Sequence, residues 1–103
     1  MSKFVLAYTG GGMAATEEEQ AAVMEAWGAW FGQLGDAVAE IGNPFATSAV
    51  VGPDGATSAG GPSGLTGYSV VNADSLDSAT TLAKGCPVLA SGGSVEVYEA
   101  IEM

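Results

Sequence analysis

The sequence predicts an α+β fold: a ferredoxin-like βαββαβ sandwich, in which a four-stranded antiparallel sheet carries two helices on one face and an extra small hairpin. Three observations support this. The chain has 103 residues, enough for one core, so we expect a single domain over residues 1–103. Short β-type runs alternate with two segments of helical periodicity, and their order is β, α, β, β, α, β. Right-handed crossovers then place both helices on one face of the sheet.

The N-terminal part supplies the first strand and the longer helix. Residues 3–8 form a short apolar run that ends at Thr9 and the glycines 10–12, as strands do. Thr16 precedes Glu19 by three residues, which is the spacing of a capping box, so a helix begins here. Apolar residues recur along it at three- and four-residue steps and predict its core face. They are Val23, Met24, Trp27, Trp30, Phe31 and Leu34.

The end of this helix is rich in glycine. Gly28 and Gly32 are spaced four apart, which would let another segment approach the helix closely. Gly35 ends or bends the helix, and residues 36–41 are expected to extend it by about a turn. The Gly-Asn-Pro sequence at 42–44 then stops it.

The middle of the chain is predicted to hold two strands and the hairpin. Residues 45–51 (FATSAVV) are expected to form the second strand, and the GPDG sequence at 52–55 has the residues of a tight turn into residues 56–60. Residues 65–73 are the third strand. The glycines of residues 57–64 lead into this strand rather than into a helix, and no lysine follows them, so we expect a turn and no phosphate loop.

The C-terminal part supplies the second helix and the last strand. Asp74 is predicted to cap this helix, with Asp77 three residues on. Gly85 and Pro87 close it, and residues 95–101 (VEVYEAI) form the last strand. The apolar positions of the helix are Leu76, Ala79 and Ala83.

Composition limits the classes of partner. Twelve acidic residues against two basic ones give a formal charge of -10, and the chain has no histidine. Nucleic acid and membrane surfaces are therefore not expected as partners, because binding either requires clustered lysine and arginine. No apolar run is long enough to span a bilayer and no secretory signal is evident, so we expect a cytoplasmic protein. The single Cys86 is expected to be a buried apolar residue, and no metal or other cofactor is expected.

Strand alternation predicts two apolar faces on the sheet. The bulky Trp27, Trp30 and Phe31 are expected to pack on the face of smaller residues: Val5, Ala7, Gly67, Ser69, Val71, Val95 and Val97. The opposite face would then hold Phe4, Leu6, Tyr8, Tyr68, Val70, Glu96 and Tyr98. Because an apolar face of this kind marks a partner surface, we predict a homodimer that closes sheet on sheet.

Tyrosine hydroxyls and a carboxylate in such an interface need hydrogen-bond partners. Either they satisfy one another, or they surround a wet cavity that is open to a small apolar or aromatic molecule. The candidate pocket consists of Tyr8, Phe45, Tyr68, Glu96 and Tyr98. No catalytic residue is assigned.

The quoted segments also resemble a known family. LTGYSVVNADSLDSATTLAKGCPVLASGGSVEVYEAIEM resembles the C-terminal half of YCII-related proteins, in particular the bacterial branch of DGPF-domain proteins. MSKFVLAYTGGG and AWGAWFGQLGD are similar to that branch's first strand and helix end. The resemblance implies a ferredoxin-like sandwich that dimerises through its sheets into a dimeric α/β barrel, in a family whose members mostly have no assigned function.

Two departures from the family pattern bear on activity. Where the branch has Asp-Gly-Pro-Phe, this chain reads AGGPS, with Gly61 and Pro62 in the middle and Ser63 in place of the aromatic residue. Some members carry a histidine and an aspartate that look like an acid and base pair, and this chain has no histidine. The resemblance therefore implies the fold and the dimer more than it implies catalysis.

Three functions remain open at this point. The first is a non-catalytic dimeric module, either structural or binding a small molecule. The second is a lyase or isomerase that uses Glu96 or Asp36 as a general base with a pKa raised by burial. The third, which the resemblance allows, is a regulatory partner protein that acts beside transcription factors.

Overall fold

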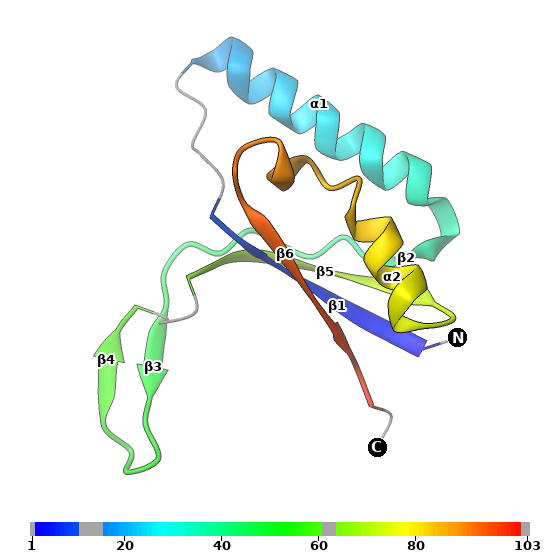
Figure 1. Ribbon diagram of the computed structural model, residues 1–103. Coiled ribbons are helices and arrows are strands. Elements are labelled where there is room, and N and C mark those ends of the chain that lie inside the picture. Colours follow the sequence, from blue (N-terminus) through cyan, green and yellow to red (C-terminus); the bar gives the residue numbers. More distant parts are fainter. Residues whose placement is uncertain (1, 11–15, 61–63, 102–103) are drawn as a thin grey trace.

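The computed structural model describes residues 2–10, 16–60 and 64–101. Its main sheet has four antiparallel strands in the order β2-β5-β1-β6, with β1 at Ser2–Thr9, β2 at Val38–Glu40, β5 at Leu65–Ala73 and β6 at Ser94–Glu99. Helices α1 (Glu17–Leu34) and α2 (Leu76–Ala83) lie on one side of this sheet (Figure 1). Two 3₁₀ helices, η1 (Gly35–Ala37) and η2 (Pro87–Leu89), follow α1 and α2 along the chain. The architecture is α+β and is compatible with the predicted ferredoxin-like fold.

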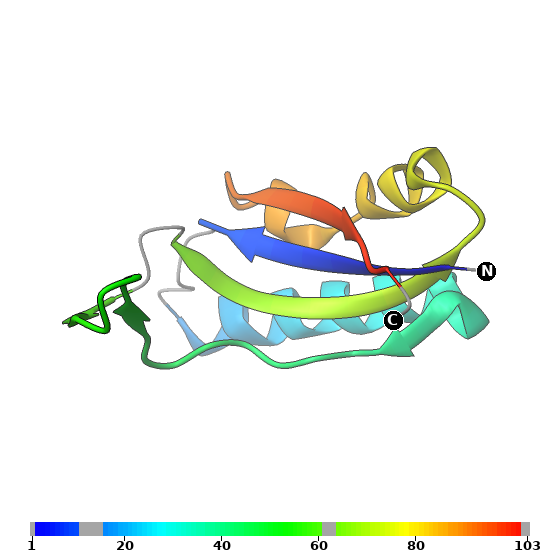
Figure 2. The ribbon, with the colours of Figure 1, turned by 90° about the horizontal axis from the view of Figure 1, so that it is seen from below.

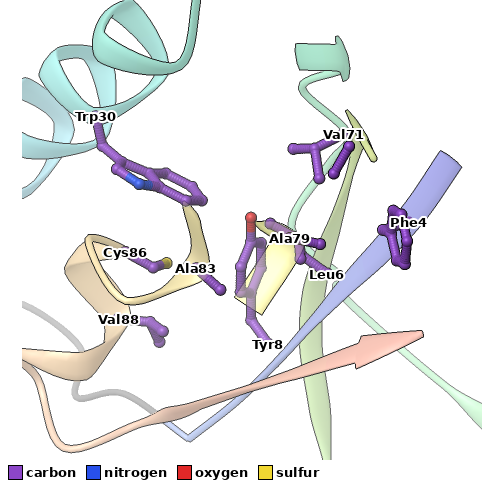
Figure 3. Close-up of a cluster of buried hydrophobic side chains, with 10 residues drawn as sticks. Phe4, Leu6, Tyr8, Trp30, Val71, Ala79, Ala83, Cys86 and Val88 are labelled. Atoms are coloured by element: carbon purple, nitrogen blue, oxygen red, sulfur yellow. The ribbon is translucent and has the colours of Figure 1, made fainter. Parts of the chain in front are cut away.

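The core lies between the sheet and the helices, and its largest fully buried side chains, Phe4 and Leu6, come from β1. Phe4 and Leu6 have no exposed surface, and Tyr8 is buried beside them (Figure 3). Helix α2 faces the sheet with small residues, which leaves room for these large ones. The other members of the core cluster are Trp30, Val71, Ala73, Ala79, Ala83, Cys86 and Val88.

The predicted placement of Phe4, Leu6 and Tyr8 on the uncovered face is therefore wrong. Tyr8 pairs with Gly67 and Leu6 pairs with Ser69, and directly opposed residues of an antiparallel pair share a face. The three large side chains of β1 thus join the small residues of β5 beneath the helices.

The opposite face of the sheet, which no described helix covers, is called the outer face (Figure 2). Val5 pairs with both Val70 and Tyr98, and Ala7 pairs with both Tyr68 and Glu96. The outward positions of the β5 and β6 residues agree with the prediction, and those of the β1 residues reverse it. The outer face consists of Val5, Ala7, Tyr68, Val70, Glu96 and Tyr98.

The second strand of the main sheet occurs earlier in the sequence than predicted. Gly35 caps α1 with φ 54°, and the chain turns through η1 so that Val38 pairs with Val71. The segment expected to extend α1 is thus η1 and β2. Of residues 45–51 only β3 (Ala49–Val51) is a strand, and it pairs with β4 (Thr57–Ala59) in a separate two-stranded sheet.

That two-stranded sheet is the predicted hairpin, and it projects from the body of the molecule (Figures 1 and 2). Its tight turn is closed by a hydrogen bond from the Gly55 amide to the Gly52 carbonyl at 2.9 Å. The Asp54 carboxylate also accepts a bond from the Ala56 amide at 3.0 Å. The GPDG sequence therefore forms the turn that its residue types predict.

Helix α1 begins as predicted, since the Thr16 hydroxyl accepts a hydrogen bond from the Glu19 amide at 3.1 Å. Toward its N-terminus the helix leans away from the sheet (Figure 1), so Val23 and Met24 are exposed where core positions were expected. Gly28 and Gly32 face open space, and no described atom would lie within 4 Å of an added Cβ. The close approach predicted for this pair is not made within the described chain.

The C-terminal half of α1 does pack as predicted, and Trp30 fixes it to α2. The buried Trp30 indole donates a hydrogen bond to the Leu82 carbonyl of α2 at 3.2 Å. Helix α2 is capped by Ser75, whose hydroxyl accepts from the Ser78 amide at 3.1 Å, and not by Asp74 as predicted. No helix among the described residues combines the length and apolar character needed to cross a bilayer.

Candidate functional site

An irregular segment, residues 41–45, forms one wall of the candidate site along the edge of β5. The Asn43 carbonyl accepts a hydrogen bond from the Tyr68 amide at 3.2 Å, and the Phe45 amide donates to the Thr66 carbonyl at 2.9 Å. Gly42 lies against the backbone of β5 with φ 78°, and an added Cβ there would come within 1.9 Å of the Tyr68 carbonyl oxygen. Glycine is therefore required for this segment to follow the strand so closely.

Aromatic residues of α1 and β1 form the facing wall. The Tyr8 and Trp27 rings meet edge to face with centroids 5.0 Å apart. Phe31 extends the cluster, 5.9 Å from Trp27. These are ordinary distances for favourable ring contacts.

Between the two walls lies a cavity of about 440 Å³, which we call the ring cavity. Its size is in the range of small-molecule sites. No described residue of its wall is acidic or basic. The wall consists of Tyr8, Met24, Trp27, Phe31, Ile41, Gly42, Asn43, Pro44, Thr66, Gly67, Tyr68, Ser69 and Val88.

A buried hydrogen-bond chain crosses the wall of the ring cavity. The Tyr8 hydroxyl donates to Ser69 Oγ at 2.7 Å, and Ser69 Oγ donates to the Ile41 carbonyl at 2.5 Å. Burial raises the pKa of the Tyr8 hydroxyl from 10.0 to about 12, so it stays protonated at neutral pH. These two hydrogen bonds connect the segment that contains Ile41 to the central strands β1 and β5.

The structure brings together some of the predicted pocket residues and separates others. Tyr8 and Tyr68 are both wall residues of the ring cavity, but the Tyr8 side chain lies beneath the helices and that of Tyr68 lies on the outer face. Phe45 stacks on Tyr68 with ring centroids 5.8 Å apart. Glu96 and Tyr98 lie on the outer face, where the Tyr98 hydroxyl donates to the Glu96 carboxylate. That hydrogen bond raises the pKa of Tyr98.

Asp36, the other predicted general base, lies exposed in η1. Neither Asp36 nor Glu96 is among the wall residues of the ring cavity. The carboxylates on which an enzymatic function would depend are thus placed outside it.

Sequence reasoning missed several wall residues. Met24, Trp27 and Phe31 were assigned to the core, because helical spacing does not show where a helix leans away from its sheet. The Gly-Asn-Pro sequence at 42–44 was interpreted only as a helix stop. A signal was present in it, since a glycine also suits a backbone held tightly against a strand.

A second, more open hollow of about 510 Å³ lies between α1 and η2. Cys86 is part of its wall but is itself buried, as predicted. Burial raises the pKa of this thiol to about 11, so it is not a reactive thiolate at neutral pH. Alanine is the most frequent residue type of the remaining wall, and within the described chain no group of three or more potential metal ligands gathers there or elsewhere.

The family follows from comparison with known proteins. A family model described as the YCII-related domain matches residues 1–103. The chain belongs to the YCII-related family. No curated protein and no solved structure gives a significant match to this YCII-related chain. The AGGPS sequence that stands in place of Asp-Gly-Pro-Phe ends at residues 61–63, which lie outside the described residues.

Proposed function

We propose that this YCII-related protein is a non-catalytic small-molecule-binding module that works as a homodimer. The observation that carries the proposal is the ring cavity of about 440 Å³, whose described wall has aromatic rings on one side, backbone on the other, and no acidic or basic side chain. A cavity with this lining can hold an apolar molecule but offers no group to transfer a proton at neutral pH.

The ionisable groups near the cavity support a binding role over an enzymatic one. Tyr8 has a pKa of about 12 and Cys86 one of about 11, so both stay neutral. Asp36 and Glu96 lie away from the cavity wall, and the chain has no histidine. A lyase or isomerase mechanism would need a base inside the cavity.

The outer face supports the homodimer part of the proposal. Val5 and Val70 form its apolar centre and are only partly exposed, and Tyr98 beside them is more open to solvent. The Tyr98 and Tyr68 hydroxyls donate to Glu96 and Glu40 within the same chain. Since these polar groups already have partners, the face can be covered by a second copy at a lower desolvation cost. Membership of the DGPF branch, whose sheets are expected to pair in this way, is part of the same proposal.

The binding proposal is tested with the uncharged fluorescent probe N-phenyl-naphthylamine, whose emission rises in apolar sites. We expect saturable binding of one probe per chain. Met24 and Ile41 line opposite sides of the ring cavity and are 75% and 61% exposed, so larger side chains fit there without crowding the core. Met24→Trp and Ile41→Trp should each narrow the cavity and weaken probe binding about tenfold or more.

Ile101→Trp is the matched control, because Ile101 is 84% exposed and is not part of the cavity wall. It should leave probe binding unchanged. Equal binding by all of these variants and the parent protein would show that the ring cavity is not the binding site.

A further inference from the structure

We infer that the ligand of the ring cavity is an uncharged aromatic molecule, held by contact with rings rather than by hydrogen bonds. The inference rests on the proposed function and specifies its ligand class. Three properties of the described wall lead to it: its charge, the state of its hydroxyl groups and its rings.

The first property is charge. The described wall contains no acidic or basic side chain, so an ionised ligand would lose its hydration without meeting an opposite charge. The Glu40 carboxylate is bonded to a wall residue, since it accepts a hydrogen bond from the Tyr68 hydroxyl at 2.6 Å, but Glu40 is not itself part of the wall. The wall therefore favours a neutral molecule over an anion or a cation.

The second property is that the hydroxyl groups of the described wall already donate their hydrogens to hydrogen bonds within the protein. Tyr8 donates to Ser69, and Ser69 donates to the Ile41 carbonyl. Thr66 Oγ1 donates to the Tyr8 carbonyl at 3.2 Å, and the Tyr68 hydroxyl donates to Glu40 on the outer face. A ligand rich in hydroxyl, carboxylate or phosphate groups would have to break these bonds or leave its own groups unpaired, and both are costly.

Among the described residues, the remaining polar side chains of the wall are the Asn43 amide and the Trp27 indole. Asn43 also interacts with the Tyr68 hydroxyl. The described side chains of the wall can therefore donate hydrogen bonds to one or two acceptor atoms of the ligand at most.

The third property is the wall's rings. Tyr8 comes from β1, Trp27 and Phe31 come from α1, and the Trp27 ring contacts both of the others, so a flat apolar molecule can meet both ring edges and ring faces. Met24 beside them has a flexible, polarisable side chain that adapts to aromatic surfaces.

The test is displacement of N-phenyl-naphthylamine by three competitors that share one ring system and carry one small polar substituent of different charge: naphthylmethanol (neutral), naphthoate (anionic) and naphthylmethylammonium (cationic). The titrations are run at moderate salt, so that the formal charge of -10 acts weakly at long range. We expect naphthylmethanol to displace the probe at a concentration at least about tenfold lower than either ion. Displacement by either ion at the same or a lower concentration would overturn the inference.

A charge placed at the cavity provides a second test. Met24→Lys should improve competition by naphthoate relative to naphthylmethanol by about tenfold, because it supplies the missing opposite charge. Ile101→Lys adds the same charge away from the cavity wall and should leave that ratio unchanged. An unchanged ratio in Met24→Lys would contradict the role given to the neutral wall.

The two proposals fail in different ways. If Met24→Trp and Ile41→Trp leave probe binding intact, the site itself is wrong and the proposed function falls with it. If those variants lose the probe but charged and neutral competitors are equivalent, the site stands and only the ligand class is wrong.

Discussion

Glycines in this chain have opposite roles at Gly42 and at Gly28 and Gly32. Gly42 has φ 78° and its Cα faces the Tyr68 carbonyl, whereas Gly28 and Gly32 lie in α1 with open space around them. Gly42→Ala should therefore destabilise the fold by at least about 2 kcal/mol. Gly28→Ala and Gly32→Ala should each stabilise it by about 0.5–1 kcal/mol, because alanine is the better helix former. Urea denaturation of the three variants measures both signs, and a stabilising Gly42→Ala would refute the close contact with β5.

The buried Tyr8 makes stability sensitive to alkaline pH. Its pKa is raised from 10.0 to about 12, so above pH 10 the unfolded chain loses this proton before the folded one does. The stability that depends on protonated Tyr8 is complete below pH 10, and it is lost as the pH rises through about 12, by about 2–3 kcal/mol. Tyr8→Phe should cost about 1 kcal/mol at neutral pH, from the lost bond to Ser69, and should flatten this alkaline loss. The denaturation midpoints of the parent protein and of Tyr8→Phe are compared across this pH range. Cys86, whose pKa is about 11, is present in both proteins, so its own alkaline loss of stability affects both alike.

Helix α1 is held to the fold mainly through its C-terminal half. Trp30 is buried and bonded to Leu82, and Met24 on the same helix is largely exposed. Trp30→Ala should lower the free energy of unfolding by about 3–5 kcal/mol. Met24→Ala, the control within the same helix, should change it by less than about 0.5 kcal/mol. Similar effects of the two changes on the denaturation midpoint would mean that the N-terminal half of α1 is packed after all.

At the scale of elements, short sequence patterns correctly predicted the features that depend only on neighbouring residues. The capping pair Thr16 and Glu19, the GPDG turn and the long strand at residues 65–73 all occur where their residue types indicate. The side of the sheet that β1 presents could not be read from alternation, because both of its faces are apolar. Only its pairing with β5, a long-range property, decides that Phe4, Leu6 and Tyr8 point inward.

The candidate site was harder to predict for the same reason. Tyr8 and Tyr68 could be chosen as pocket residues from their type alone, but the facing wall depends on how α1 leans and on how residues 41–45 follow β5. Strand β2 was missed because it has only three residues and begins directly after η1. Tertiary pairing of Val38 with Val71 outweighs the weak local preference of so short a segment.

The whole molecule is more open than a compact chain of its length. It measures 44 × 41 × 19 Å and has a radius of gyration of 14.9 Å, against about 13 Å for a compact domain of this size. Two features account for this, the projecting hairpin and the leaning α1 (Figure 1). The thin dimension is that of one helical layer on one sheet, and the outer face is left open by the described chain.

The proposed homodimer is tested at the centre of that face. Val70 lies between the strands that carry Glu40 and Val5, so Val70→Glu adds an acid that a second copy would repeat across the interface. We expect light scattering at micromolar concentration to show a dimer for the parent protein and a monomer for Val70→Glu. Val51→Glu, in the exposed part of the hairpin, adds the same charge and should remain dimeric. A parent protein that scatters as a monomer would rule out the proposed assembly.

Backbone hydrogen bonds close the hairpin within residues 48–60: the Gly60 amide donates to the Ser48 carbonyl, and the Gly52 amide donates to the Ala56 carbonyl. Its tip at Pro53 and Asp54 is exposed, and neither residue is part of the ring cavity wall. Extra residues introduced there would lengthen a self-contained loop at little entropic cost. This tip is consequently the natural place to insert an affinity tag or a fluorescent reporter without loosening the core.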